Sequence, residues 1–318
     1  MQWLVFAFLG TIFFSAAGVI DKLLLGSYAE DSRSYIICQI IAQQVFTIPI
    51  ILFVGADFAY PESILALLFG CLQVVPTFFY MRALQMDEAS KVTALEFVYL
   101  VFVFMGSVLL LGEMMDLKQC AGGILLVVGS ILISCRKSNC ESMHSGGPAP
   151  KWFSLNGIAS FAALSPAIKP FLPYWILTAA YYLTLKYLLI SIDEWHLYTW
   201  SSLGNLVAVL PLLIIPSTRR DVFGFFSRKG IAVGVLISEE VFQFLGIISS
   251  IFAYSLGSVS LVSSIGALQP IMTVLIILAL GLIVPGIAKD LNEKTDWIAM
   301  MQKGLAFMVM IVGIYLVG

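Results

Sequence analysis

The sequence has few charged residues. Only 11% of its 318 residues are Asp, Glu, Lys or Arg, against about 25% in an average soluble domain. A soluble protein with so little charge could not cover its surface, and the mean hydropathy of +0.99 points the same way. The net charge of −2 offers no basic face to a nucleic acid. These shortages predict an all-α polytopic membrane protein with no nucleic-acid partner.

Recognisable catalytic and metal-binding motifs are also missing. The five cysteines contain no CxxC pair, and there is no HExxH, GxSxG or Walker-type glycine loop. The longest polar segment, Arg136 to Lys151, reads as a linker and is too short for a catalytic domain. The sequence therefore predicts neither an enzyme nor a cofactor or metal site.

Long apolar runs fill most of the chain. A membrane-spanning helix needs about 20 apolar residues. By that measure we expect ten spans, at residues 2–20, 34–54, 62–84, 89–111, 117–135, 171–192, 196–216, 231–256, 259–285 and 298–317. The stretch 152–168 is short and interrupted by Asn156, Gly157 and Pro166, so we expect it to lie at the interface. If it crosses, the count becomes eleven and every later orientation reverses.

The two halves of the chain resemble each other. At an offset of 170, ALQMDEASKVTAL from Ala83 lies against AYSLGSVSLVSSI from Ala253, and Gln73 lies against Gln243. Smaller offsets of 162 to 164 pair Gln43 with Asn205 and Lys22 with Lys186. We expect a first five-span repeat at 1–135, a linker with an interfacial segment at 136–170, and a second repeat at 171–318. An odd number of spans inverts the second repeat, as in many secondary transporters.

The basic residues supply a test of that inversion. Fifteen of the 17 Lys and Arg residues lie in or near the loops that follow odd-numbered spans. Because cytoplasmic loops carry the excess of Lys and Arg, both termini are predicted to face outward and the linker inward. Lys22 and Lys186 lie near span ends, where long side chains commonly extend to the interface.

Several small-residue patterns resemble EamA-type proteins of the drug/metabolite transporter superfamily. They are Ala83-Leu84, Ala89-Ser90, Gly112-Glu113 and the glycines Gly122, Gly123 and Gly129, with Gln269-Pro270 in the second half. The second half departs from the family because no Gly-Glu pair follows its fourth span. The resemblance implies a ten-span carrier with a central cavity formed by spans 1–4 and 6–9, and spans 5 and 10 to the side. The resemblance gives almost no information about the substrate.

Three acidic residues lie inside apolar spans. Glu96 is in the fourth span, and Glu239 and Glu240 are in the eighth. A charged side chain in mid-helix costs roughly 2.5–3.5 kcal/mol on insertion scales, so each one needs a reason. One reason is a polar cavity lining that binds a cation, an amine or a coupling proton. The other is a structural hydrogen bond between helices.

Other polar residues are candidates for the same lining. Gln73, Gln243, Gln43 and Asn205 lie within spans, where helix-to-helix hydrogen bonding explains any one of them equally well. Tyr80, Tyr99, Tyr181 and Tyr182 could wall a cavity against an organic solute, or pack as ordinary aromatic residues. We include Tyr99 with the amides and the three acids in the predicted site.

These features favour a secondary transporter of the cell membrane for a small organic solute. The mid-span charges are all acidic, which favours cationic, zwitterionic or neutral solutes, with protons as a candidate coupling ion. A carrier of anionic or phosphorylated metabolites is one alternative, and a non-transporting receptor or assembly factor is another. The expected partners are the solute and the lipid bilayer, with the chain acting as a monomer or homodimer.

Overall fold

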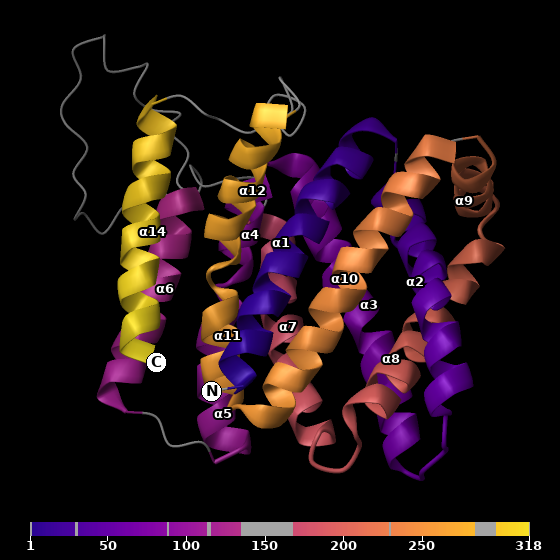
Figure 1. Ribbon diagram of the computed structural model, residues 1–318, viewed down its shortest axis with the longest axis horizontal. Helices are drawn as coiled ribbons and strands as arrows, with labels where there is room; N and C mark the ends of the chain where they lie inside the picture. Colours follow the sequence, from indigo (N-terminus) through magenta and orange to yellow (C-terminus); the bar gives the residue numbers. More distant parts are fainter. Residues whose placement is uncertain are drawn as a thin grey trace.

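The computed structural model describes residues 2–28, 31–87, 89–112, 116–134, 168–228, 230–283 and 297–317. Every regular element in these ranges is a helix (Figure 1). Seven helical segments of this part of the chain are long and apolar enough to cross a membrane. The prediction of an all-helical polytopic protein is therefore confirmed for the described ranges.

The helices follow the order of the predicted spans. They are α1 (Gln2–Ser27), α2 (Ser32–Val54), α3 (Glu62–Met86), α4 (Ala89–Glu96), α5 (Tyr99–Leu110), α6 (Leu117–Ser134), α7 (Ile168–Leu188), α8 (Glu194–Val209), the 3-10 helix η3 (Leu210–Ile214), α9 (Pro216–Arg228), α10 (Gly230–Leu256), α11 (Val259–Gly266), α12 (Gln269–Ile283) and α14 (Trp297–Val317). Because α1 continues past residue 20, Asp21 and Lys22 lie within a helix. The predicted interfacial segment falls, up to residue 167, outside the described residues.

The predicted spans 89–111 and 259–285 are each present as one apolar segment long enough to cross a membrane, but each consists of two helices separated by a break. At the first break, the Phe97 and Val98 amides donate to Ala94 and Leu95 at 3.3 Å. In the second half the bonds recur 170 residues later, from Ala267 to Ser264 and from Leu268 to Ile265, at 3.1 and 3.0 Å. Both breaks are therefore tight 3-10 turns.

Each break also accepts a hydrogen bond from the other half of the chain. Trp175 Nε1 in α7 donates to the Leu95 carbonyl at 2.8 Å. Thr11 Oγ1 in α1 donates to the Ile265 carbonyl at 3.5 Å. Side-chain donors of this kind can satisfy irregular backbone inside a membrane, where no bulk water is present. The first helix of each half thus contacts the broken helix of the other.

A second contact recurs at the ends of α3 and α10. Lys22 Nζ donates to the carbonyls of Leu84 and Asp87, the latter at 2.6 Å. Lys186 Nζ donates to the carbonyls of Tyr254 and Gly257 at 2.8 and 2.7 Å. Lys22 is only 4% exposed, so the interpretation that this lysine reaches the interface is wrong. Both lysines instead bind the carbonyl ends of neighbouring helices, where the helix dipole favours a cation.

The helices lie side by side, from α6 and α14 at one edge of the molecule to α2 and α9 at the other (Figure 1). At one edge α6 packs against α14, where an added Cβ on Gly313 would lie 2.9 Å from the Gly122 carbonyl oxygen. Helices α1, α3, α7 and α10 occupy the middle, with α2, α8 and α9 toward the other edge. The ends marked N and C lie on the same side of the layer.

Helix α9 was expected as a loop and is an amphipathic helix. Thr218, Val222 and Phe225 are buried, whereas Arg219 and Arg220 are exposed. Its apolar side packs against α2 and η3. Arg219 and Arg220 therefore lie on the open face of this short helix.

Candidate functional site

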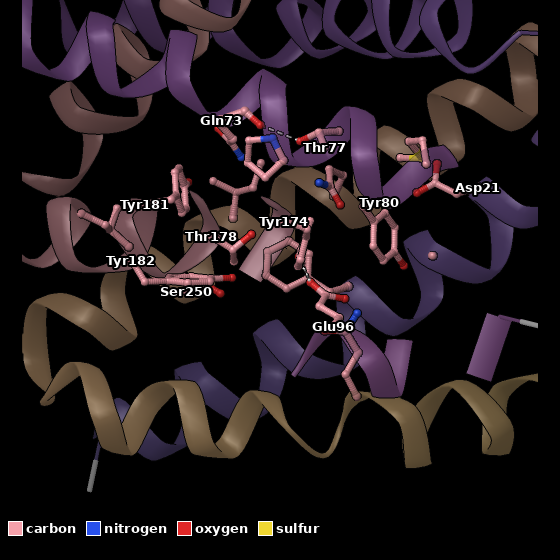
Figure 2. Close-up of a pocket in the computed structure, with 18 of the residues that line it drawn as sticks. Asp21, Gln73, Thr77, Tyr80, Glu96, Tyr174, Thr178, Tyr181, Tyr182 and Ser250 are labelled. Atoms are coloured by element: carbon pink, nitrogen blue, oxygen red, sulfur yellow. Dashed lines mark hydrogen bonds between the residues drawn. The ribbon is translucent and has the colours of Figure 1, made fainter. Parts of the chain in front are cut away.

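A cavity of about 150 Å³ lies where helices from the two halves meet. It is lined by α1, α3, α4, α7, α10 and α12, and Figure 2 shows its polar and aromatic side chains. A cavity of that volume can hold a molecule about the size of benzene. We call it the central cavity. Its lining residues are Phe14, Gly18, Asp21, Gln73, Pro76, Thr77, Tyr80, Met81, Glu96, Tyr174, Thr178, Tyr181, Tyr182, Leu185, Gln243, Ile247, Ser250, Ile251 and Gln269.

Glu96 lies directly before the break in the fourth span and lines this cavity. It is the last residue of α4, so its side chain lies at the negative end of that helix dipole. Its Oε1 accepts a hydrogen bond of 2.6 Å from the Tyr174 hydroxyl (Figure 2). Its Oε2 is buried and has no hydrogen-bond partner. One carboxylate oxygen therefore remains available to a ligand or a proton.

Tyrosines supply much of the aromatic wall around Glu96. The rings of Tyr80 and Tyr174 are 6.2 Å apart, and those of Tyr181 and Tyr182 are 5.3 Å apart, edge to face. In Figure 2, Tyr80 lies between Asp21 and Glu96, with Tyr181 and Tyr182 toward the opposite end. Aromatic faces attract organic cations. None of the described residues that line this cavity is a Lys, Arg or His.

The predicted amides divide between the central cavity and a smaller one. Gln73 and Gln243 line both. Gln43 and Asn205 line only the smaller cavity, of about 50 Å³, and Asn205 Nδ2 donates to Gln73 Oε1 at 3.3 Å. The structure thus brings the four amides near one another. Asn205 also makes the helix-to-helix bond that was the alternative explanation for it.

The remaining predicted residues lie outside the central cavity. Glu240 lines the smaller cavity, and Tyr99 lines a third one of about 30 Å³ together with Glu96. Glu239 is fully buried and lines none of these three cavities. Whether any of the eight residues binds a solute stays a prediction.

The structure adds residues that the sequence analysis did not select. Asp21, Tyr174 and Gln269 all line the central cavity. Asp21 was assigned to a loop because Asp and Lys in succession ended the apolar run of the first span. Nothing in the sequence around Tyr174 distinguishes it from the other tyrosines of the predicted spans. Gln269 was noted only as part of a Gln-Pro pattern, although it is polar and lies within a predicted span.

A second group of acidic residues lies near the first. Asp21 Oδ1 accepts hydrogen bonds from the Tyr35 hydroxyl at 2.6 Å and from Gln39 Nε2 at 3.0 Å. Glu239 and Glu240 on α10 are close enough to interact electrostatically with Asp21. All three carboxylates are at most 4% exposed. We call Asp21, Glu239 and Glu240 the acidic cluster.

Comparison with known proteins agrees with this architecture. Residues 1–135 match the family model described as the EamA-like transporter family. No curated protein matches the sequence. A solved structure described as "Crystal structure of protein" has a TM-score of 0.53 at 16% identity, covering 97% of this chain and 95% of that chain, which shows a shared fold. The first 135 residues are therefore similar to the EamA-like transporter family, and this match together with the seven apolar helical segments of the described ranges identifies a multi-pass integral membrane protein.

Proposed function

We propose that the protein is a secondary transporter of the plasma membrane that carries a small organic solute by alternating access. The solute is a cation, a zwitterion or a neutral molecule that binds in the central cavity. The observation that carries this proposal is the buried, unpartnered Glu96 Oε2 beside tyrosine rings, in a cavity formed by both halves of the chain.

Two inverted five-helix repeats are the framework that we propose for this motion. Both predicted fourth spans break at equivalent positions, at Phe97–Val98 and Ala267–Leu268. The lysine contacts at the ends of α3 and α10 recur at matching offsets as well. Broken helices at the interface between repeats are common at the substrate sites of secondary transporters. These recurrences support the repeat without depending on apolar sequence alignment.

The charge of the lining supports the choice of solute. Phosphorylated or other anionic solutes are generally held by Arg or Lys. The described lining of the central cavity contains Asp21 and Glu96 instead. A carboxylate with a free oxygen can bind an ammonium group directly, and the neighbouring tyrosine faces can surround its alkyl substituents.

Thermal stabilisation of the purified protein by a solute panel tests this function. The panel contains organic ammonium ions, amino acids, neutral metabolites, carboxylates and sugar phosphates. A solute at 100 times its Kd should stabilise the folded state by about 2.7 kcal/mol. We expect stabilisation by members of the first three classes. Stabilisation by phosphorylated or anionic solutes alone, or by none of the panel, would contradict the proposal.

A further inference from the structure

Helix α9 has an open face that neither the packing of the helices nor the central cavity uses. Arg219, Arg220 and Phe223 are exposed on this helix. Successive residues of an α-helix point about 100° apart, so these three side chains fall within about 100° of one another. The buried residues Thr218 and Phe225 lie on the other side of the helix, which packs against α2, η3 and α10. We call Arg219, Arg220 and Phe223 the α9 face.

The two arginines of the α9 face have no acidic partner. No ion pair joins either of them to an Asp or Glu among the described residues. The positions three and four residues before and after each arginine, where a helical neighbour could pair with it, contain no acid. The adjacent acid, Asp221, points about 100° away from Arg220 and farther from Arg219. Two exposed positive charges are therefore available to a partner outside the chain.

Exposed apolar side chains lie beside these charges. Phe223 follows both arginines by one helical turn, and its ring is 63% exposed. Just before α9, Ile214 and Ile215 are 78% and 42% exposed. Helices that lie in a membrane interface combine such residues, because the apolar groups enter the boundary of the acyl chains while the cations stay among the headgroups. A soluble acidic partner would account for the arginines but not for the apolar residues.

The position of α9 also fits contact with the membrane surface. The helix connects η3 to the start of α10, at the edge of the molecule and toward the side opposite to the ends marked N and C (Figure 1). The distribution of Lys and Arg predicts that this side is cytoplasmic. The cytoplasmic leaflet is the one that carries anionic lipids and attracts basic segments.

We propose that the α9 face binds the headgroups of anionic phospholipids. The guanidinium groups of Arg219 and Arg220 donate hydrogen bonds to lipid phosphate, and Phe223 enters the boundary of the acyl chains. A zwitterionic phospholipid binds less well, because its own cationic group offsets the phosphate charge. This site is separate from the central cavity and does not depend on the transport of a solute.

Quenching of a fluorophore beside the α9 face by nitroxide-labelled lipids tests the site. The fluorophore is attached at Ser227→Cys, an exposed position on α9, in the full chain with its native cysteines replaced. This parent protein is placed in phosphatidylcholine nanodiscs that contain an equal small fraction of nitroxide-labelled phosphatidylglycerol or nitroxide-labelled phosphatidylcholine. We expect phosphatidylglycerol to quench more strongly. Raising NaCl from about 0.05 M to about 0.5 M should reduce that preference, because salt screens exposed charges.

Variants of the α9 face separate the role of charge from that of the ring. Arg220→Gln should raise the fraction of phosphatidylglycerol needed for half-maximal quenching about 5-fold, and Arg219→Gln with Arg220→Gln should remove the preference. Phe223→Ser should weaken quenching by both lipids. The matched control is Arg33→Gln with Arg82→Gln, which removes two exposed arginines from α2 and α3 and should keep the preference. All of these side chains are exposed, so each variant should keep the Tm of the parent protein in phosphatidylcholine.

Three results would overturn the proposal. The first is equal quenching by the two lipids in the parent protein, and the second is the same preference in the double α9 variant as in the control. The third is binding of soluble poly-glutamate through Arg219 and Arg220 with no preference for phosphatidylglycerol, which would identify an acidic protein as the partner. Failure of every solute to bind would contradict only the proposed function.

Discussion

Glu96 has one satisfied carboxylate oxygen and one free oxygen. Tyr174 donates to Oε1 and so fixes the side chain toward the central cavity, while Oε2 has no partner. Ionisable groups inside membrane helices are expensive and usually functional. Oε2 can therefore accept a hydrogen bond from a donor group on the solute.

Replacement of Glu96 by Gln should weaken binding of an organic ammonium ion. Loss of one charge-assisted hydrogen bond costs about 2 kcal/mol, so the Kd should rise about 30-fold. Calorimetric titration with the best ammonium ligand of the panel measures this change. Tyr187→Phe is the control, because Tyr187 lies on the same helix as Tyr174 but is 60% exposed. An equal Kd in native protein and Glu96→Gln would exclude Glu96 from the site.

The sequence identified only those site residues that contrast with their surroundings. Glu96, Gln73 and Gln243 were found because each interrupts an apolar run. Asp21 was missed because an adjacent Asp and Lys resemble the end of a span, whereas in the structure α1 continues to Ser27 and Lys22 binds the end of α3. Tyr174 could not be found, because its role depends on its distance from Glu96, 78 residues away.

Among the secondary-structure elements, the breaks at 97–98 and 267–268 place Glu96 and Gln269 at helix ends beside the cavity. The hydropathy of both segments is continuous, and Phe97 and Val98 are ordinary helix residues, so local sequence predicts one helix. The partners at the breaks, Trp175 and Thr11, come from the other half of the chain. The sequence of one segment alone cannot predict such long-range contacts, and so it cannot predict the breaks.

The close approach of α3 and α8 gives a stability prediction for these elements. Gly70→Ala places a Cβ against the backbone of Ser201, so the helices must separate. We expect a loss of about 1–3 kcal/mol, seen as a lower Tm of the purified protein in detergent. Gly234→Ala on α10 is the matched control, because an added Cβ there meets nothing within 4 Å. Equal Tm values for the two variants would show that α3 and α8 are not held at this distance.

For the whole molecule, the distribution of basic residues predicts the orientation in the membrane. Both marked ends lie on the same side of the helix layer (Figure 1). The excess of Lys and Arg in the loops after odd-numbered spans places those ends outside and the linker inside. That all-helical, multi-pass architecture followed from composition and run lengths alone, but the orientation is a separate prediction.

Cysteine labelling in intact cells tests the orientation. Cys140 lies in the predicted cytoplasmic linker, and a chain that keeps only this cysteine should react with an impermeant maleimide only after the cells are permeabilised. A chain with Ile190→Cys alone, in the exposed connection between α7 and α8, should react in intact cells. Reaction of Cys140 in intact cells, with Ile190→Cys reacting only after permeabilisation, would show that the orientation is opposite to the predicted one.

The central claim is that the whole molecule carries a solute bound at Glu96 from one side of the membrane to the other. Its most direct test is counterflow in liposomes that contain only this protein and are preloaded with an unlabelled solute from the stabilisation screen. We predict that liposomes with native protein or Tyr187→Phe accumulate the labelled solute transiently. With an ammonium solute, Glu96→Gln liposomes should accumulate far less at the same concentration. No accumulation by folded native protein, or equal accumulation by Glu96→Gln, would contradict the claim.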